Sequence, residues 1–365
     1  MILFLNFAPI EFLGGAEQWI YQTAQHIHTK EKTVLLSVSP TISNLYSRVV
    51  LKRSFDKRVT AIHDIESHSL TLRHFLPFTR EYSSITTLFD ECRFIYIRYE
   101  LPEVLIALYF GGFPILKKLI AGLHSSILYQ QPLTLVDHLH NIIYGSWFSK
   151  IVLRKCNKVH VINHRDEKII KEKFHVQQVI YIPTCVDLDI RDKNYSRKQH
   201  HKSIVLFIGE LTMRKGVDIL LDVIKRLPEN LSIHIAGNGP MEKQIKEAAT
   251  DKQDIVFYGH LNKKSLYALY EKADVLFLPS RAEGFPLVFH EAMAHGLRIV
   301  DSPFCNVGLP GYIEKANDDN SITGYIALLS EDVPASNGRK IQDYYKKHFY
   351  HADINKQIDS TLFEL

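Results

Sequence analysis

Apolar runs alternate with amphipathic segments through the first 190 residues of the chain. Met1 to Phe7 is an apolar run, an amphipathic segment follows from about Ala16 to Thr29, and Thr33 to Val38 is apolar again. A strand, a helix and a second strand in this order are typical of a doubly wound domain. The pattern also predicts helices over 101–109 and 144–154 and further strands over 94–97, 119–123, 158–162 and 179–182. Residues 54–91 follow neither period, and both loops and a small helical insertion agree with them.

The same alternation is clearer in the second half of the chain. Apolar runs predict strands over 203–208, 231–236, 255–258, 274–279 and 297–301, and a short last strand over Gly324 to Ala327. Helices are predicted over 217–227, 241–249 and 265–272, after Pro286, and over the aromatic segment 338–365. The polar segment 187–202 lacks periodicity and is predicted to be the linker between the two halves.

These patterns predict an α/β protein built from two Rossmann-like doubly wound domains. The first spans residues 1–190 and the second residues 191–340, and the C-terminal helices, about 340–365, are expected to pack back on the first domain. A chain of 365 residues is long for one domain and sufficient for two.

The composition agrees with a globular enzyme of the cytoplasm. Hydrophobic residues make up 46% of the chain and charged residues 23%, and no apolar run approaches the 18 residues of a membrane-spanning helix. The N-terminal run is interpreted as a first strand and not as a signal peptide. The 4 cysteines are scattered, as in a reduced protein. A net charge of +4 is too small to indicate nucleic-acid binding.

The stretch from Ser280 to Gly296 has the most distinctive local pattern. An apolar run over 274–279 precedes it and is typical of a buried parallel strand. Pro286 suits the first turn of a helix, and Gly296 suits its C-terminal cap. The stretch is therefore predicted to be a loop at the carboxyl end of a strand, followed by a helix.

Two acids in this stretch, Glu283 and Glu291, are candidate ligand contacts. Open α/β sheets bind ligands at the carboxyl ends of their strands, where Glu283 is expected, and Glu291 follows in the helix. Free amides at a helix N-terminus suit a phosphate. Carboxylates beside such amides could hold a sugar nucleotide, although an ordinary loop with solvated acids fits the spacing equally well. The amides concerned are those of Gly284, Phe285, Leu287 and Val288.

Two other segments agree with a phosphate-containing ligand. Gly14 and Gly15 stand just before the first helix, where a glycine pair permits close approach of a bound group. They do not form a Gly-x-Gly-x-x-Gly fingerprint, so an ordinary dinucleotide site is a weak fit. Arg214 and Lys215 lie in the polar loop after the strand over 203–208, and such a pair can grip a diphosphate.

Taken together, these motifs resemble those of the retaining glycosyltransferases of family 4, the glycosyl transferases group 1, whose GT-B fold has two Rossmann-like domains facing a central cleft. Glu283 and Glu291 match that family's Glu-x7-Glu motif, within Ala-Glu-Gly-Phe-Pro…Glu-Ala-Met-Ala-His-Gly. Arg214-Lys215-Gly216 matches its basic loop, Gly237-Asn-Gly-Pro its glycine turn and Gly14-Gly15-Ala16-Glu17 its N-terminal loop. The resemblance covers most of the chain and is densest in the second half.

The resemblance implies transfer of a sugar from a UDP- or GDP-linked donor to an acceptor hydroxyl, without a metal or other cofactor. Glu283 would contact the transferred sugar and Glu291 the ribose, while Arg214 and Lys215 would neutralise the leaving diphosphate. His124, after the strand over 119–123, would lie near the reacting sugar. The other residues expected to bind the donor are Gly14, Gly15, Gly237, His260, Leu261, Gly284, Phe285, Pro286, Leu287 and Val288.

Some positions depart from the family's pattern. Glu210 stands where the family usually has an arginine, Pro183-Thr-Cys-Val-Asp187 replaces Pro-Asn-Gly-Val-Asp, and the region of Gly308 and Glu314 matches only in part. A sugar-nucleotide-binding protein with impaired catalysis is therefore an alternative. A glycoside hydrolase using the acid pair is a third hypothesis, which the phosphate-binding features do not favour.

The acceptor is expected on the first domain and is a glycan or a lipid-linked or protein-linked sugar. The aromatic and basic run from Tyr109 to Lys118 could contact a membrane, which would make the protein cytoplasmic and peripheral to a bilayer, although helix packing with exposed lysines also explains it. The sequence leaves open the sugar and base of the donor, the acceptor and the oligomeric state.

Overall fold

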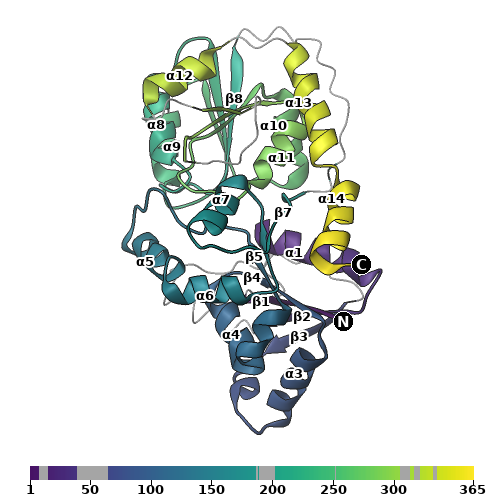
Figure 1. Cartoon of the computed structure of the whole chain (residues 1–365). Coiled ribbons are helices and arrows are strands. Elements are labelled where there is room, and N and C mark those ends of the chain that lie inside the picture. The colour runs from purple at the N-terminus through teal and green to yellow at the C-terminus, as the bar shows by residue number, and fades with distance from the viewer. Residues whose placement is uncertain are drawn as a thin grey trace. The chain divides into compact units, whose positions relative to one another are not determined.

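The computed structural model describes residues 1–7, 15–38, 65–185, 188, 202–250, 252–304, 313–315, 321–331 and 335–365. The chain forms two compact units, each assembled from separate stretches of sequence (Figure 1). Unit 1 comprises Met1–Ile127, Ile143–Thr184 and Ala352–Leu365. Unit 2 comprises Leu128–Ile142 and Cys185–His351.

Unit 1 is built on a parallel sheet of seven strands in the order β3-β2-β1-β4-β5-β6-β7. This order, with the first strand central and later strands added on both sides, is the doubly wound arrangement. The strands are β1 (Ile2–Asn6), β2 (Thr33–Val38), β3 (Glu66–Leu70), β4 (Phe94–Arg98), β5 (Leu119–Leu123), β6 (Lys158–Val161) and β7 (Val179–Tyr181). Its helical elements are α1 (Gly15–His28), η2 (Leu72–Phe75), α3 (Arg80–Glu91), α4 (Leu101–Gly111), η3 (Phe113–Lys118), α6 (Trp147–Lys155), α7 (His164–Glu172), α14 (His351–Gln357) and the π-helix η4 (Ile358–Phe363).

The last residues of the chain complete the core of unit 1. The Phe363 ring lies 5.7 Å from that of Phe4 in β1 and 6.4 Å from that of Phe94 in β4. Asp359 is buried and accepts a hydrogen bond from His26 Nε2 of α1 at 2.9 Å, and it also pairs with Lys30, which follows α1. The C-terminal segment therefore belongs to the unit that contains the N-terminus.

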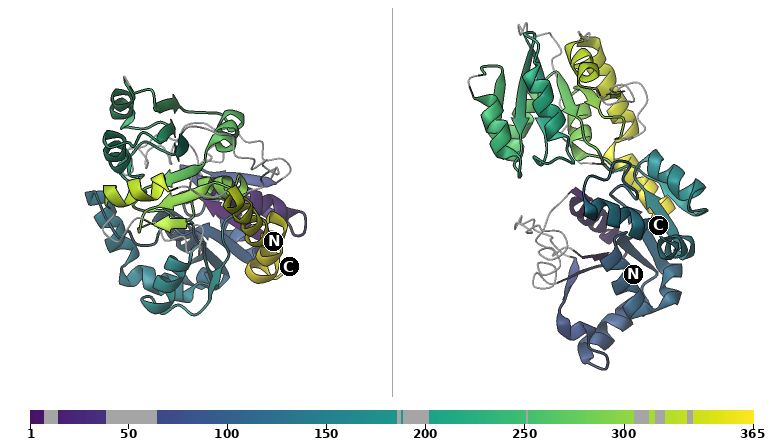
Figure 2. Two further views of the ribbon diagram at one scale, coloured as in Figure 1. Left: turned by 90° about the horizontal axis from the view of Figure 1, so that it is seen from above. Right: turned by 90° about the vertical axis from the view of Figure 1, so that its left-hand side faces the viewer.

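Unit 2 repeats the doubly wound arrangement with six parallel strands in the order β10-β9-β8-β11-β12-β13. Helices cover both faces of this sheet (Figures 1 and 2). The elements are β8 (Ser203–Ile208), α8 (Val217–Lys225), β9 (Leu231–Ala236), α9 (Glu242–Ala249), β10 (Ile255–Gly259), α10 (Lys263–Lys272), β11 (Val275–Leu278), α11 (Leu287–Ala294), β12 (Arg298–Asp301), β13 (Ile313–Lys315), α12 (Ile322–Ser330) and α13 (Ala335–His348). A further helix, α5 (Leu135–Tyr144), lies mostly in the stretch Leu128–Ile142.

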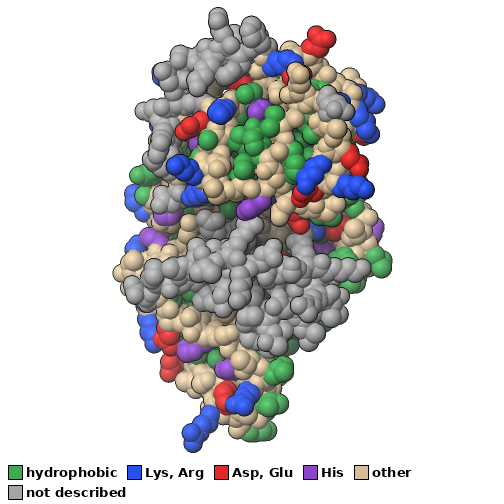
Figure 3. Space-filling view, turned by 180° about the vertical axis from the view of Figure 1, so that it is seen from behind, with side chains coloured by type: hydrophobic (Ala, Val, Ile, Leu, Met, Phe, Trp, Pro, Cys, Tyr) green, Lys and Arg blue, Asp and Glu red, His purple; other side chains and the backbone are tan. Residues whose placement is uncertain are grey.

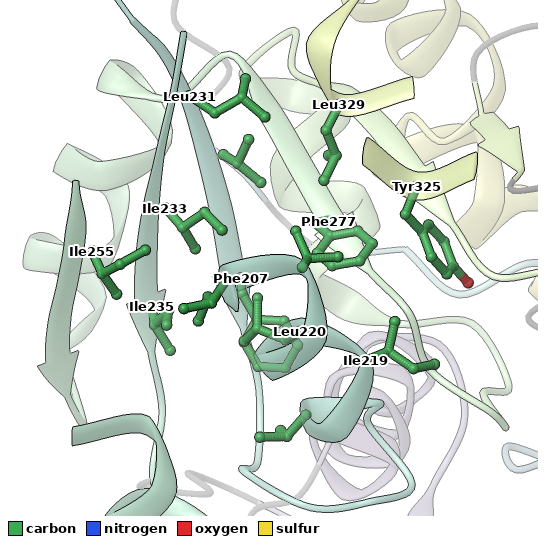
Figure 4. Packing of buried hydrophobic residues seen from close by; sticks show 14 of the residues in the cluster. Phe207, Ile219, Leu220, Leu231, Ile233, Ile235, Ile255, Phe277, Tyr325 and Leu329 are labelled. Atoms are coloured by element: carbon green, nitrogen blue, oxygen red, sulfur yellow. The ribbon is translucent and has the colours of Figure 1, made fainter. Parts of the chain in front are cut away.

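The core of unit 2 explains why its apolar runs form buried strands. Phe207 of β8 and Phe277 of β11 are fully buried, and Leu220 of α8 packs with them (Figure 4). Tyr325 of α12 meets Phe277 with ring centroids 5.1 Å apart. Two parallel Rossmann-like sheets confirm the predicted fold class.

One predicted element was wrong, and two predicted helices begin at residues other than those expected. The segment Gly324 to Ala327 is part of α12 and not a strand, because Ser321 caps the helix and accepts a hydrogen bond from the Gly324 amide at 3.1 Å. The helix predicted over 265–272 begins at Lys263, since Asn262 accepts from the Ser265 amide at 2.9 Å. The helix predicted over 144–154 begins at Trp147, after the cap Ser146.

The described part of the segment that followed neither period, residues 65–91, extends the sheet. It adds the edge strand β3, the short helix η2 and α3. The Phe75 ring packs against Tyr109 and Phe110 of α4, at 5.8 and 5.5 Å, which fixes η2 on unit 1. The polar composition of β3 concealed it, because only Leu70 of this edge strand is buried.

One close backbone contact joins the loops that follow β8 and β11. Gly216 caps α8 with φ 72°, and a Cβ at this position would lie 2.1 Å from the Pro279 carbonyl oxygen. Gly259, at the end of β10, has nearly the same backbone angle, φ 66°, but no described atom lies within 4 Å of its added Cβ.

These two glycines form a matched pair for a stability test. Alanine in a left-handed backbone lowers the free energy of unfolding by about 1 kcal/mol or more in both variants. In Gly216→Ala, overpacking lowers it by about 1–3 kcal/mol more. Gly216→Ala should therefore lower the urea midpoint of unit 2 clearly more than Gly259→Ala. Equal losses in the two variants would contradict the close contact.

Candidate functional site

The loops at the carboxyl edge of the unit 2 sheet carry most of the predicted site residues. Because β9, β8 and β11 are adjacent and parallel, the loops that leave them are neighbours. The loop after β8 contains Arg214 and Lys215, and the loop after β11 contains Glu283. Residues separated by about 70 positions in the sequence therefore meet at one edge of the sheet.

Arg281 joins these two loops. Its guanidinium donates two hydrogen bonds to the Asp218 carboxylate, at 2.7 and 2.6 Å, and another to the Met213 carbonyl at 2.5 Å. The Arg281 amide also donates to the Arg214 carbonyl at 2.8 Å. A forked guanidinium can hold a carboxylate and a backbone oxygen together, so Arg281 fixes the shape of the loop that contains Lys215.

Lys215 and Glu283 form an ion pair within this frame. The ammonium of Lys215 donates to Glu283 Oε1, and the side chains are 26% and 11% exposed. Partial burial reduces screening by water and strengthens the pair. Arg214 has a different contact: its guanidinium carbon lies 5.7 Å from the centre of the ring of Tyr129, which belongs to the stretch Leu128–Ile142 of unit 2.

The helix α11 begins immediately after this loop. Pro286 is its N-cap and not a first-turn residue as predicted, and Leu287 and Val288 form the first turn, where amides lack intrahelical acceptors. The Phe285 ring is buried and stacks on the His290 ring, with centroids 4.6 Å apart. Gly284 and Phe285 can therefore contact a ligand only through their backbone atoms. His295, and not Gly296 as predicted, is the C-cap of α11; Gly296 follows it in the left-handed conformation, with φ 67°, and its amide donates to the Met293 carbonyl.

Glu291 lies in the middle of α11 and has a neutral partner. Tyr270 of α10 donates its hydroxyl proton to Glu291 Oε2 at 2.7 Å, and the Tyr270 ring stacks on His295 at 5.1 Å. Burial raises the pKa of Glu291, while the Tyr270 hydrogen bond and the charge of Lys263 oppose the rise. The two acids of the motif thus have different surroundings, an ammonium for Glu283 and a phenol for Glu291.

The remaining predicted residues of unit 2 lie on the neighbouring turns. The Gly237 amide donates to the Gly259 carbonyl at 2.8 Å, which places the turn after β9 beside the turn that contains His260 and Leu261. His260 is exposed and Leu261 is half-buried. Glu210, where the family pattern usually has an arginine, is exposed on the loop after β8.

The predicted residues of unit 1 are only partly described. Gly14 lies outside the described residues, and Gly15 begins α1. Glu17 is buried and forms an ion pair with Arg98 at the end of β4. Glu103 of α4 is fully buried in unit 1, where burial raises its pKa to about 7 although Arg98 opposes the shift.

His124 follows β5 and belongs to an aromatic cluster. Its Nε2 lies 2.8 Å from the Tyr96 hydroxyl, and its ring centre lies 4.7 Å from that of Trp19. Burial lowers the pKa of His124 well below its ordinary value, and the nearby His160 and Arg98 lower it further. His124 is therefore neutral near pH 7.

Asp187 and Gly308 lie outside the described residues, and Glu314 is described only as part of the β13 backbone.

Within the described ranges, no three His, Cys, Asp or Glu side chains are grouped so that they could hold a metal ion. Among the helices described, none has the length and apolar character needed to cross a bilayer.

Four residues around the predicted site were not identified from the sequence, namely Arg281, Asp218, Tyr270 and Tyr96. Arg281 lies inside the Ser280–Gly296 stretch and could have been noticed there as a cation beside the motif. The others had no local signal, because each acts on a residue distant in the sequence.

Comparisons with known proteins agree with the fold and the motif. Residues 189–347 match the family model described as "Glycosyl transferases group 1". An uncharacterized glycosyltransferase of Haemophilus influenzae is 34% identical over 171 residues, which cover 45% of this chain and 46% of that protein. The matched segment thus spans about half the length of this relative.

Two further similarities extend over more of the chain. A Campylobacter jejuni α-1,4-N-acetyl-D-galactosaminyltransferase, named for a diphosphoundecaprenol-linked substrate, is 27% identical over 214 residues, 56% of this chain and 58% of that protein. The crystal structure of Anabaena HepE in complex with UDP has a TM-score of 0.71 at 18% identity and covers 100% of both chains. The chain therefore has the GT-B fold.

The role of Arg281 can be measured with a double-mutant cycle. Arg281→Lys and Asp218→Asn each disrupt the two hydrogen bonds from the Arg281 guanidinium to the Asp218 carboxylate. Their effects on the free energy of unfolding should therefore be coupled by about 1 kcal/mol or more. The exposed pair Lys225–Asp222 on the same helix, 2.8 Å apart, is the control and should couple by less than about 0.5 kcal/mol. Additive effects at Arg281 and Asp218 would contradict the proposed connection between the loops.

Proposed function

We propose that this protein, whose residues 189–347 match the family model of the glycosyl transferases group 1, transfers a sugar from a nucleoside diphosphate sugar to an acceptor hydroxyl. The observation that carries the proposal is the Lys215–Glu283 pair beside the first turn of α11. Cationic side chains and free amides suit a diphosphate, and a carboxylate suits sugar hydroxyls.

Each residue then has a distinct task in donor binding. Glu291 binds the ribose hydroxyls, and Tyr270 orients its carboxylate. Lys215 and Arg214 neutralise the diphosphate, together with the amides of α11. His260 and Leu261, at the end of β10, contact the base, and Gly237 with the Gly14-Gly15 loop lines the phosphates. These assignments rest on the motif match and on the adjacency of the unit 2 loops.

The chemistry follows from where charge develops. Departure of the nucleoside diphosphate places negative charge on the leaving oxygen, which Lys215 and Arg214 stabilise without a metal ion. Glu283 contacts the sugar that is transferred, and His124 hydrogen-bonds one of the reacting hydroxyls. Transfer proceeds with retention: the acceptor oxygen bonds to the anomeric carbon on the face from which the diphosphate leaves, and a leaving phosphate oxygen takes the acceptor's proton.

The donor nucleotide is UDP or GDP, and UDP is favoured because the Anabaena structure, which has the same fold, contains UDP. The acceptor is a glycan or a lipid-linked or protein-linked sugar. The name of the Campylobacter relative supports a lipid-linked acceptor. The N-terminal domain, residues 1–190, binds the acceptor, and the domain of residues 191–340 binds the donor.

A binding protein with impaired catalysis is the second candidate. Exposed Glu210 favours it, because an acid on the loop of Lys215 repels a diphosphate and occupies the place of a phosphate-binding arginine. The two candidates differ in turnover and not in nucleotide binding.

Isosteric changes at the two acids separate binding from transfer. UDP at 100 times its dissociation constant should raise the stability of the wild type by about 2.7 kcal/mol, read as a shift in melting temperature. Glu291→Gln should reduce this shift because the ribose loses its acceptor. Glu283→Gln should keep or increase it, since Lys215 is released for the diphosphate, yet it should lower transfer at least 100-fold.

The controls for this experiment are GDP and ADP, their sugars and free uridine, which lacks the diphosphate. Transfer unchanged in Glu283→Gln would refute the role of Glu283. Binding without turnover in the wild type, across the donors and acceptors, would favour the second candidate. No shift with any of the nucleotides would refute the donor site.

We further propose that unit 1 contacts the surface of an anionic membrane, where a lipid-linked acceptor would reside. Leu72, Leu76 and Phe78 are exposed around η2, and Phe78 is fully so with φ 70°. Arg73 lies among them, Arg80 follows them, and both are exposed. At the lower edge of Figure 3, hydrophobic side chains lie beside Lys and Arg, and acidic side chains lie nearby. Apolar residues next to cations match an anionic bilayer surface.

Flotation with vesicles tests this contact. The wild type should bind phosphatidylcholine vesicles that contain phosphatidylglycerol and bind less to pure phosphatidylcholine. Leu76→Ser with Phe78→Ser should reduce binding several-fold, whereas Tyr350→Ser, an exposed aromatic change in unit 2, should not. Equal binding by both variants would show that the η2 surface does not contact lipid.

A further inference from the structure

A hydrogen-bonded chain runs from the backbone of unit 1 to His124. His160 Nε2 lies 2.8 Å from the Ile182 carbonyl oxygen, and His160 Nδ1 lies 2.8 Å from the Tyr96 hydroxyl. The same hydroxyl lies 2.8 Å from His124 Nε2. The three side chains come from β4, β6 and the end of β5, which are distant in sequence and close in the sheet.

The backbone carbonyl determines the tautomer of His160. The Ile182 oxygen can only accept, so His160 Nε2 must carry the proton. Burial lowers the pKa of His160 to about 4, and its ring is therefore neutral near pH 7. A neutral imidazole has one bare nitrogen, which makes His160 Nδ1 an acceptor.

The same logic continues to His124. Burial raises the pKa of Tyr96 well above its ordinary value, so its hydroxyl keeps the proton and donates it to His160 Nδ1. The Tyr96 oxygen then accepts, and its donor is His124 Nε2. Because His124 is also neutral, its Nδ1 carries no proton and can only accept a hydrogen bond.

The surroundings leave this arrangement little freedom. A Cβ on Gly122 would lie 2.0 Å from the Tyr96 hydroxyl, so the absence of a side chain there admits the hydroxyl. The Trp19 ring centre lies 4.7 Å from that of His124 and 5.2 Å from that of His160. His124 Nδ1 is buried and has no hydrogen-bond partner among the described residues.

We propose that Tyr96 and His160 are positioning residues that hold His124 in the Nε2–H tautomer, so that its Nδ1 accepts a hydrogen bond from a substrate hydroxyl. The hydroxyl as ligand rests on the proposed glycosyl transfer, whereas the tautomer rests on the contacts and on the neutrality of the two buried rings. The site selects a hydroxyl donor over a carbonyl or ether oxygen, because a bare nitrogen offers no proton.

The tautomer can be measured without activity. In protein labelled with ¹⁵N-histidine, long-range ¹H–¹⁵N correlation spectra distinguish protonated from bare ring nitrogens, and His124→Asn identifies the signal. Wild-type His124 should show protonated Nε2 and bare Nδ1. Tyr96→Phe should change this pattern. Tyr99→Phe, which removes a buried hydroxyl bonded to Ser149 Oγ at 2.8 Å, should not.

Kinetics test the consequence for transfer. Tyr96→Phe should lower kcat/KM at least tenfold with the dissociation constant for UDP unchanged, while Tyr99→Phe should stay within about twofold of the wild type. A protonated Nδ1 in the wild type, or a pattern unaffected by Tyr96→Phe, would overturn the inference whatever the activity. The expected spectra with unchanged kcat/KM in Tyr96→Phe would overturn the role in substrate binding. A protein with the expected spectra and no transfer would refute the proposed function and leave the tautomer established.

Discussion

The contact between the Gly216 backbone and the Pro279 carbonyl sets the geometry of the unit 2 site. Strands β8 and β11 are hydrogen-bonded neighbours, so the loops that leave them compete for the same space. The missing side chain of Gly216 lets these loops touch, with room for neither water nor a methyl group between them. Arg281 then joins the loops through Asp218 and Met213. Lys215 reaches Glu283 only because this frame holds its loop in place.

The two acids of the motif, Glu283 and Glu291, differ in chemistry because their hydrogen-bond partners differ. Glu283 faces an ammonium, so the charges cancel in a site shielded from solvent, where an isolated carboxylate would be costly. In the proposed function, a diphosphate bound near Lys215 would compete with Glu283 for the same cation and free the carboxylate for sugar hydroxyls. Glu291 has instead the phenol of Tyr270, a partner that no anion displaces. Under the same proposal, the fixed carboxylate suits a ribose that does not react, and the exchangeable one suits the sugar that does.

The parts of the fold that could be predicted are those with local signals. Buried parallel strands are continuous apolar runs, and the motif from Glu283 to Glu291 is contiguous. The apolar segment at Gly324 is too short for its hydrophobic period to distinguish a strand from a helix. A single residue, the N-cap Ser321, starts a helix there. Arg281 and Asp218 are 63 positions apart, and Tyr96 and His160 are 64 apart, so no pattern along the chain links them. The division of each unit into separate stretches has no local signal either.

Both units place a glycine where a polar atom must approach the backbone beside a candidate site residue. In unit 1, Gly122 admits the Tyr96 hydroxyl two positions before His124, and in unit 2, Gly216 admits the Pro279 carbonyl next to Lys215. In unit 1, the Tyr96 hydroxyl fixes the position of a proton on His124. In unit 2, the Pro279 carbonyl fixes the position of the loop that contains Lys215. A side chain held this way is oriented by the sheet and not by its own rotamer preference. Parallel strands bring residues that are distant in sequence to the same edge of a sheet. A glycine at that edge lets a polar atom of a distant residue come into direct contact there, and this contact orients the neighbouring side chain.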